Sequence, residues 1–416
     1  MKAYLEAYGC TANKSNASLV KGILKEYSHE IVKRIDDADV LILLTCTVIG
    51  TTEQRMLSRL REFKKTGKKI IVAGCMASVQ PDLVKSIIPD ARLLPPQYSH
   101  HILDLLDDKK VSFTLKNKTL MSKYFEDITA PISIAEGCAF SCSYCITSLA
   151  RGRLISYPID EIVQDVCSAL RQGCKEIQLT AQDTGSYGSD TGSNLGELLT
   201  SVCKIKGEYR IRVGMMNPYA AMKNLDSTIR AYDDPKIYKF LHLPVQSGND
   251  DILKKMGRRY TAGDFIEIVK RFREKYPDIM ISTDIIVGFP TETDEQFQHT
   301  TDLLKVVKPD IVNITRYSAR PYTKAKAMGG RIKTDIVKER SKMSTKLCST
   351  ISKENNLRHI GKNYTMLVTE KGKNNTVVGR AENYKPIVIR ENIEVGEFVS
   401  VKVKDVTSTY LFGRLI

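Results

Sequence analysis

The segment GCAFSCSYC brings three cysteines, Cys138, Cys142 and Cys145, into one short loop. Thiolates are the ligands of iron–sulfur clusters, and three of them can hold three irons of a cubane cluster while the fourth iron keeps an open position. A structural zinc site needs a fourth protein ligand, and no Cys or His follows at zinc-finger spacing. Ferredoxin-type electron carriers normally supply four cysteines. The loop therefore predicts a cluster whose open iron binds a substrate.

Three more cysteines each follow an expected strand in the first hundred residues. The apolar segments AYLEAY, DVLILLT and KKIIVA end just before Cys10, Cys46 and Cys75, and a helix-patterned run comes after each. This alternation predicts a parallel sheet with right-handed crossovers, in which the loops after the strands gather at one edge. One such cysteine would be read as an ordinary buried residue. Three at the same topological position are expected to converge as a second set of ligands.

A second run of alternating strands and helices begins near residue 131. Strands are expected in PISIAEG, KEIQLTA, YRIRVGMMN, KFLHLPVQ, DIMISTDIIVGFP and PDIVNITRY. Six alternations predict an open or partial barrel, in which reactive groups lie at the carboxyl ends of the strands. The cysteine loop follows the first of these strands. The sequence TETDEQF after the fifth contains a capping box, Thr293 with Gln296, that marks a helix start.

Polar residues at the other strand ends are candidates for contacts to a cofactor. Each has a plain alternative as a hydrogen bond that satisfies its own loop. An aromatic residue between two of the cysteines could pack beside a bound cofactor, or could simply fill the loop. The candidates are Tyr144, Gln182, Asn217, His242, Gln246 and Asp284.

The last sixty residues change to short alternating segments. Five of them, from YTMLVTEK to YLFGRLI, predict a small antiparallel barrel of the oligonucleotide-binding kind. Residues 357–416 hold ten Lys or Arg against six Asp or Glu, and the whole chain has a net charge of +15. Such charge favours a polyanionic partner such as nucleic acid, with plain solubility as the alternative. The preceding stretch KTDIVKERSKMSTKLCSTISKENN predicts a basic helix, either a solvated linker or a further RNA contact.

The bulk properties of the 416 residues narrow the class of protein. The length allows two or three domains. No apolar run approaches the roughly 20 residues that cross a bilayer, and the charged start does not suit a signal peptide, so a cytoplasmic protein without membrane contact is expected. Cysteines in a reducing compartment indicate metal or redox chemistry. Zinc-protease, phosphate-loop and nucleophile-elbow motifs do not occur.

The spacing Cys138-x-x-x-Cys142-x-Tyr144-Cys145 resembles that of radical S-adenosylmethionine enzymes. With the N-terminal cysteines and the C-terminal barrel, the whole chain is similar to the methylthiotransferases, whose signatures match LHLPVQSGNDDILKKMGRRY and TDIIVGFPTETDEQF. SYPIDEIVQD, LTAQDTGSYGSDTGSNLGELL and RVGMMNP resemble the eukaryotic and archaeal branch, which acts on threonylcarbamoyl-adenosine in tRNA. Thr291 stands where the family usually has Gly, and Asn249 where it often has Ser.

The resemblance implies an α/β fold in three domains. These are a Rossmann-like N-terminal domain over residues 1–125, a radical SAM core with a partial (β/α) barrel over residues 126–356, and an OB-like TRAM domain over residues 357–416. It implies two 4Fe–4S clusters, held by Cys10, Cys46 and Cys75 and by Cys138, Cys142 and Cys145, together with S-adenosylmethionine. The six cysteines would carry the reaction.

The implied activity adds a methylthio group at C2 of threonylcarbamoyl-adenosine in the anticodon loop of tRNA. The expected partners are the anticodon stem-loop, an electron donor and a sulfur donor of unknown identity, and the expected state is a monomer. Two alternatives within the enzyme class are a methylthiotransferase acting on isopentenyl-adenosine in tRNA, or on an aspartate of a ribosomal protein. A third alternative, from another class, is a non-catalytic RNA-binding protein with structural zinc.

Overall fold

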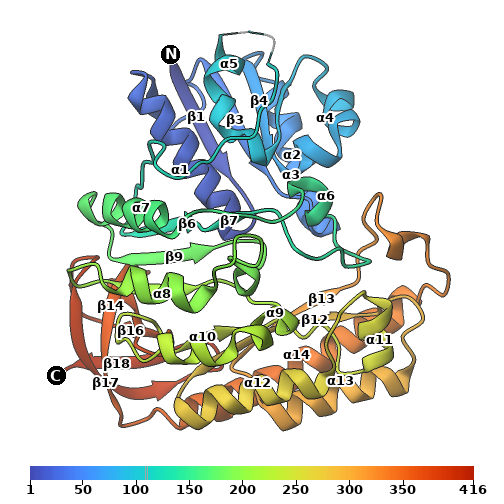
Figure 1. Cartoon of the computed structure of the whole chain (residues 1–416), viewed down its shortest axis with the longest axis vertical. Coiled ribbons are helices and arrows are strands. Elements are labelled where there is room, and N and C mark those ends of the chain that lie inside the picture. The colour runs from blue at the N-terminus through green and yellow to red at the C-terminus, as the bar shows by residue number, and fades with distance from the viewer. Residues whose placement is uncertain (108, 110) are drawn as a thin grey trace.

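The chain folds into an N-terminal sheet domain, a central core and a C-terminal barrel. The structure is a computed structural model that describes residues 1–107, 109 and 111–416. The N-terminal domain and the C-terminal barrel lie at opposite ends of the molecule, with the core between them (Figure 1).

The N-terminal domain is a five-stranded parallel sheet with the order β2-β1-β3-β4-β5. The three predicted strands occupy its centre, and every residue of β3 is buried because helices cover both faces of the sheet. Two short edge strands were not predicted. The strands are β1 (Lys2–Ala7), β2 (Glu30–Val32), β3 (Val40–Thr45), β4 (Lys69–Gly74) and β5 (Arg92–Leu94). The helices are α1 (Thr11–Glu26), α2 (Gly50–Lys64), α3 (Cys75–Val79), α4 (Pro81–Ile87), η1 (Pro96–His101) and α5 (Ile102–Leu106).

The core contains the six strands that the sequence predicts, in two parallel sheets of three. The first sheet has the order β10-β9-β6 and the second β11-β12-β13. A bridge between Ile211 and Ile237 and a 2.9 Å hydrogen bond from Met216 N to His242 O join the two sheets into a partial barrel. The strands are β6 (Thr129–Ser133), β9 (Glu176–Thr180), β10 (Arg210–Val213), β11 (Phe240–His242), β12 (Met280–Val287) and β13 (Ile311–Arg316).

Helices cover the outside of these two sheets. In α7, Ile162, Val166 and Ala169 recur at helical spacing and are fully buried against the strands. The predicted capping box begins α13: Gln296 N donates to Thr293 Oγ1 and Thr293 N donates to Gln296 Oε1. The helices are α7 (Ile159–Arg171), η2 (Thr184–Ser186), α8 (Leu195–Cys203), α9 (Pro218–Lys223), α10 (Leu225–Ala231), α11 (Asp250–Lys255), α12 (Ala262–Lys275), α13 (Asp294–Val307) and η3 (Lys324–Ala327).

The C-terminal residues form the predicted five-stranded barrel, closed in the order β14-β15-β16-β18-β17. One detail of the prediction is wrong: β16 and β18 pair in parallel, whereas the other pairs are antiparallel. Alternate residues such as Met366, Val368, Val401 and Val403 fill the interior. The strands are β14 (Asn363–Lys371), β15 (Val377–Ala381), β16 (Pro386–Ile389), β17 (Phe398–Val406) and β18 (Leu411–Leu415).

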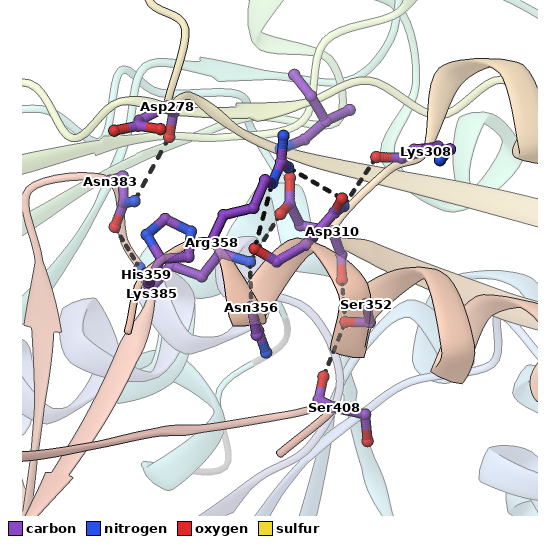
Figure 2. Close-up of polar contacts among 12 residues, drawn as sticks. Asp278, Lys308, Asp310, Ser352, Asn356, Arg358, His359, Asn383, Lys385 and Ser408 are labelled. Carbon is purple, nitrogen blue, oxygen red and sulfur yellow. Dashed lines mark hydrogen bonds and ion pairs between the residues drawn. The ribbon is translucent and has the colours of Figure 1, made fainter. Parts of the chain in front are cut away.

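The barrel docks on the residues that begin the core strands. Figure 2 shows the centre of this contact, where Lys385 Nζ lies 2.7 Å from both Asp310 Oδ1 and Asn356 Oδ1. Asp310 precedes β13, and its other carboxylate oxygen accepts from Ile281 N at 2.8 Å. Asp310 and Lys385 are both nearly inaccessible to solvent. A buried ion pair with its remaining polar atoms satisfied therefore fixes the barrel against the core.

The basic helix α14 (Thr334–Leu357) runs between the core and the barrel. Ser352 Oγ donates to the carbonyl oxygens of Asp310 and Ser408 (Figure 2). Asn356 Nδ2 donates to Thr407 O. One face of α14 is thus packed, which excludes the freely solvated linker left open by the sequence. Among the described residues, no helix is long and apolar enough to span a bilayer.

We expect the buried pair to stabilise the docked barrel far more than an exposed pair at the same contact. Lys385→Met leaves the Asp310 carboxylate buried without its cation and should lower the free energy of unfolding by about 3–5 kcal/mol. Lys362→Met, which breaks a half-exposed pair with Asp278 at 2.7 Å, should cost about 1 kcal/mol or less. Urea denaturation of both variants measures the difference, and equal losses would contradict the role assigned to Lys385.

Candidate functional site

The first cysteine trio lies on three adjacent strands of the N-terminal sheet. Cys10 follows β1 and is the N-cap of α1, Cys46 follows β3, and Cys75 follows β4 and begins α3. The register pairs Ala7 with Leu44 and Thr45 with Gly74, so the three strands end at the same level. Sheet topology therefore brings the three cysteines to one edge, as the sequence predicts.

Contacts within this edge hold the cysteines close together. Gly9 has φ of +100°, and a Cβ placed there would lie 2.6 Å from Cys46 Cβ, so only glycine lets the loop of Cys10 pass against Cys46. Burial raises the pKa of Cys75 to about 11, and the neighbouring Cys10 and Cys46 add to this shift. Iron–sulfur bonding needs thiolates, so cluster binding at this edge would release protons.

Among the described residues, no three His, Cys, Asp or Glu side chains gather closely enough to hold a single metal ion. A cubane cluster takes one thiolate at each of three irons. Its three ligands therefore lie farther apart than the ligands of one ion, so a cluster does not require the close gathering that a single ion needs.

The second trio lies in the loop between β7 (Ala135–Glu136) and α6 (Thr147–Arg151). Gly137 has φ of +69°, and a Cβ there would lie 1.9 Å from Arg153 O, so the loop enters through a close backbone approach. Ser143 N donates to Met256 O at 2.9 Å, and Ser143 O accepts from Ala325 N at 2.8 Å. Because both neighbouring segments belong to the core, they fix the loop. All three cysteines are partly accessible.

Helix α6 places the two trios next to each other. It begins two residues after Cys145 and packs on α3, which begins at Cys75 (Figure 1). Cys75 and Val79 form one buried apolar cluster with Ile146 and Ala150. Since Ile146 is the residue after Cys145, this contact joins the two cysteine sites directly.

Arg151, the last residue of α6, lies buried beside the first trio. The residue is 2% exposed, and its guanidinium forms an ion pair with Glu136. Burial opposes its charge, but Cys75 and Glu136 raise its pKa above the ordinary value. In the described structure its Nε and Nη2 atoms have no hydrogen-bond partner. Buried unsatisfied cationic donors beside three cysteines fit an anionic iron–sulfur cluster, whose sulfurs accept such hydrogen bonds.

The second trio has its own buried arginine, Arg258. Its Nη2 donates to the Tyr144 hydroxyl at 2.5 Å, and its Nε has no partner among the described residues. Burial raises the pKa of Cys142, while the charge of Arg258 opposes this rise. Burial also raises the pKa of Cys138 to about 12, and the nearby carboxylate of Asp183 contributes. A cluster at this loop fits the same chemistry as the first.

The structure brings most of the predicted cofactor contacts into one string along the strand ends. Asn217 N donates to Asp183 Oδ1 at 2.8 Å, and Asn217 Oδ1 caps α9 by accepting from Tyr219 N. His242 Nε2 lies 3.2 Å from Asp284 Oδ1. Gln182 follows β9 and is half-buried beside Asp183. Tyr144 lies on the opposite side, under Arg258, and contacts Phe289 edge-to-face at 6.4 Å.

Hydrogen bonds hold both Asp284 and Gln246 in place at the strand ends. Burial would raise the pKa of Asp284, but hydrogen bonds from His242 and Asn313 and the charge of Arg258 keep it below its ordinary value. Gln246 adopts φ of +72°, an unusual conformation for a residue other than glycine. It is held by hydrogen bonds from Gln246 N to Asp284 O and from Ile286 N to Gln246 O. Strain of this kind often lies at ligand sites.

Sequence reasoning missed the arginines of both sites. Arg258 lies within the quoted signature LKKMGRRY, but nothing in that local pattern places it beside Cys142. Arg320 is also buried; it donates to Thr47 Oγ1 and forms an ion pair with Glu53, next to Cys46. The Arg320 contacts depend on how the two domains pack, and the Arg258 contact depends on how distant segments of the core pack. The sequence alone shows neither.

Thr291, which departs from the family pattern, has φ of +68°. This left-handed conformation favours glycine, which gives a physical reason for the glycine that the family usually has at this position. The turn is nevertheless formed, because Thr291 N donates to Gly330 O at 2.8 Å and Lys255 Nζ donates to Thr291 Oγ1 at 2.7 Å.

Three family profiles match successive parts of the chain. Residues 2–94 match "Uncharacterized protein family UPF0004", residues 132–304 match "Radical SAM superfamily", and residues 357–416 match "TRAM domain". These spans coincide with the N-terminal sheet, most of the core and the barrel.

Full-length relatives share this arrangement. The chain is 43% identical to a probable threonylcarbamoyladenosine tRNA methylthiotransferase of Archaeoglobus fulgidus, over 100% of this chain and 99% of that protein. It belongs to this methylthiotransferase family. A family member of Methanocaldococcus jannaschii is 41% identical over 100% of this chain and 97% of its own length. The threonylcarbamoyladenosine tRNA methylthiotransferase of Homo sapiens is 32% identical over 99% of this chain and 74% of that protein.

Solved structures show the same core fold. The radical S-adenosylmethionine methyltransferase TsrM from Kitasatospora setae superposes with a TM-score of 0.59 at 12% identity, over 78% of this chain and 73% of that chain. The cobalamin-dependent radical enzyme OxsB superposes with a TM-score of 0.55 at 11% identity, over 82% of this chain and 56% of that chain. Membership of the radical SAM superfamily implies one 4Fe–4S cluster and S-adenosylmethionine, and it sets aside the non-catalytic zinc-protein alternative.

We expect two independent cluster sites. Cys46→Ala and Cys142→Ala should each leave about half the iron and acid-labile sulfide of the reconstituted protein, because a cluster that loses one of three thiolates is no longer held. Cys174→Ala, at a buried cysteine of the core away from both trios, is the matched control and should keep the full content. Loss of all iron in either single variant would contradict separate sites.

Proposed function

We propose that this chain adds a methylthio group to C2 of threonylcarbamoyl-adenosine next to the anticodon of tRNA. The observation that carries the proposal is the contact between α3 and α6, which joins the Cys10, Cys46 and Cys75 edge to the Cys138, Cys142 and Cys145 loop. Family membership with relatives of that printed activity supports the substrate.

Bound at these two trios, two 4Fe–4S clusters and S-adenosylmethionine would supply radical formation and sulfur delivery. The protein then has to hold and shield the reacting groups. The six cysteines bind the clusters, and Arg151 and Arg258 balance their charge inside the protein. Asn217, His242, Gln246 and Asp284 offer polar atoms to the cofactor along the strand ends, with Gln182 and Tyr144 beside them. An electron donor and a sulfur donor are further partners, and the enzyme would act as a monomer.

The C-terminal barrel supplies a basic surface for the tRNA. Lys402 and Arg414 are paired across β17 and β18, and desolvation together with the charges of Arg414 and Lys402 lowers the pKa of Lys404. In the described structure none of the three forms an ion pair, and Phe412 is exposed on the same strand. Unpaired cations beside an exposed aromatic side chain favour RNA phosphates and bases.

The test of the activity is nucleoside mass spectrometry on tRNA from cells that lack the modification and express this chain. The expected product is methylthio-threonylcarbamoyl-adenosine. A methylthio-isopentenyl-adenosine peak would favour the first alternative substrate. Unchanged tRNA together with a methylthiolated ribosomal protein would favour the second.

Two cysteine variants separate the roles of the two trios. Cys142→Ala should abolish formation of 5′-deoxyadenosine, because the cofactor-binding cluster loses one of its three thiolates. Cys46→Ala should still form 5′-deoxyadenosine but should yield no methylthio product. Chromatography of the reaction mixture measures both products, and equal loss of both in Cys46→Ala would argue against separate roles.

The basic face of the barrel gives a further prediction. The double variant Lys404→Gln/Arg414→Gln should weaken tRNA binding about tenfold or more at 0.1 M salt and should reduce the salt dependence by nearly two charges. Arg61→Gln/Lys64→Gln removes the same charge from the exposed end of α2 and is the control. Electrophoretic titration at several salt concentrations measures the tRNA affinity of both double variants. Equal affinities of the two variants would contradict RNA binding by this face.

A further inference from the structure

A cavity of about 540 Å³ opens between the N-terminal domain and the core. Its walls come from the start of α2, the ends of β12 and β13, and the segment before α14. The lining includes both apolar side chains, such as Ile314 and Val337, and the two cations Arg316 and Arg331. None of the residues assigned above to cluster or cofactor binding lines this cavity.

The cavity is linked by contacts to both cysteine sites. Ile49 and Thr51 in its wall follow Cys46 by only a few residues. On the core side, Tyr317 packs edge-to-face on Phe289 at 5.5 Å, and Phe289 packs on Tyr144, which stands between Cys142 and Cys145. Gly50 N donates to Ser318 Oγ at 3.0 Å and ties the two walls together. A group held in this cavity therefore lies beside the space where the two sites meet.

Its polar groups lack partners within the protein. Across the described chain, neither the Arg316 nor the Arg331 side chain makes a hydrogen bond or an ion pair, and both residues are exposed and line the cavity. The Tyr317 hydroxyl is buried and has no hydrogen-bond partner in the described structure. Tyr317 lines the cavity, but its hydroxyl is closed off from solvent. Unpaired cationic donors on a partly apolar wall suit a carboxylate carried on a short organic group.

We infer that this cavity binds the threonyl group of the substrate nucleoside, with Arg331 and Arg316 on its carboxylate. The inference rests on the proposed function. Threonine joined through a carbonyl to N6 of adenine keeps a free carboxylate, a hydroxyl and a methyl group. An isopentenyl group at the same nitrogen has no charge, and an unmodified adenine has no substituent. A cationic cavity at this place would thus select among the three adenines.

The first turn of α2 adds to the same field. Ile49, its N-cap, provides no side-chain oxygen to the first N–H groups, and Gly50 and Thr51 line the cavity. The positive end of a helix favours an anion. This contribution is secondary to the two arginines, because the carboxylate is recognised by charged hydrogen bonds in either case.

Binding of three matched RNA hairpins tests the inference. The hairpins share one anticodon-arm sequence and carry threonylcarbamoyl-adenosine, its threonyl methyl ester, or plain adenosine at the target position. The full-length protein with reconstituted clusters is titrated by fluorescence anisotropy. The wild type should bind the free carboxylate about ten- to a hundredfold more tightly than the ester, because a charge-assisted hydrogen bond is lost.

The variant Arg331→Gln should weaken binding of the carboxylate hairpin about tenfold or more and should leave the ester and adenosine hairpins unchanged. Lys338→Gln, which removes one charge from an exposed residue of α14 outside the cavity, is the control and should change none of the three. The unchanged hairpins also show that Arg331→Gln folds.

Two outcomes would overturn the inference. Equal losses for all three hairpins in Arg331→Gln would assign the arginine to an RNA phosphate, and wild-type protein that does not distinguish the carboxylate from the ester would remove the site. Failure of the proposed function looks different. Its sign is that tRNA from cells expressing the wild-type protein carries no methylthio-threonylcarbamoyl-adenosine, whichever result the hairpin titrations give.

Discussion

The packing of α6 on α3 is the contact on which the rest of the molecule depends. A reaction that uses two clusters requires their sites to share one space, yet the two cysteine trios come from separate sheets. Lys118 Nζ donates to Glu136 Oε1 at 2.7 Å, and Glu136 pairs with Arg151 at 3.4 Å, so a buried ionic chain accompanies the apolar contact. Lys118 also donates to Pro96 O and Asn16 Oδ1. Buried charges cost desolvation energy, but when their polar atoms are satisfied they tolerate only one arrangement of the partners.

A similar arrangement holds the other end of the core. At this end the buried ion pair is formed by Lys385 and Asp310. Asn356 Oδ1 accepts from Lys385 Nζ, and Ser352 Oγ donates to Asp310 O. Apolar contacts among Tyr238, Phe240 and Met280, with Tyr384 packed against them, complete this second contact. Removing the whole barrel would therefore expose apolar surface and an unpaired carboxylate at the starts of the core strands. Point substitutions on the outer face of the barrel test RNA binding without this damage.

The sequence was informative where topology alone decides the position of a residue. Cys10, Cys46 and Cys75 each follow a parallel strand, and the loops after such strands meet at one edge whatever the details of packing. The five segments of the barrel were likewise readable from their period of two, although their order around the barrel was not. The short edge strands β2 and β5 have only three residues each, which is too few for a period to appear. Arg151, Arg320 and Arg331 lie at the contact between the N-terminal domain and the core, and Arg258 meets Tyr144 from a distant part of the core, so no local pattern could assign them.

The position of the barrel decides how long a ligand must be to contact both ends of the core. The barrel touches the first residues of the core strands, and the cysteine loop and its neighbours lie at their far ends. An eight-residue strand such as β12 spans about 26 Å, so the two surfaces are separated by at least the thickness of the core. With both ends fixed by buried ion pairs, that separation is a set length. A free nucleoside could fill the cavity lined by Arg316 and Arg331 but could not reach the barrel. A folded polynucleotide of sufficient length could contact both. The enzyme would then gauge the size of its ligand as well as the chemistry of one base.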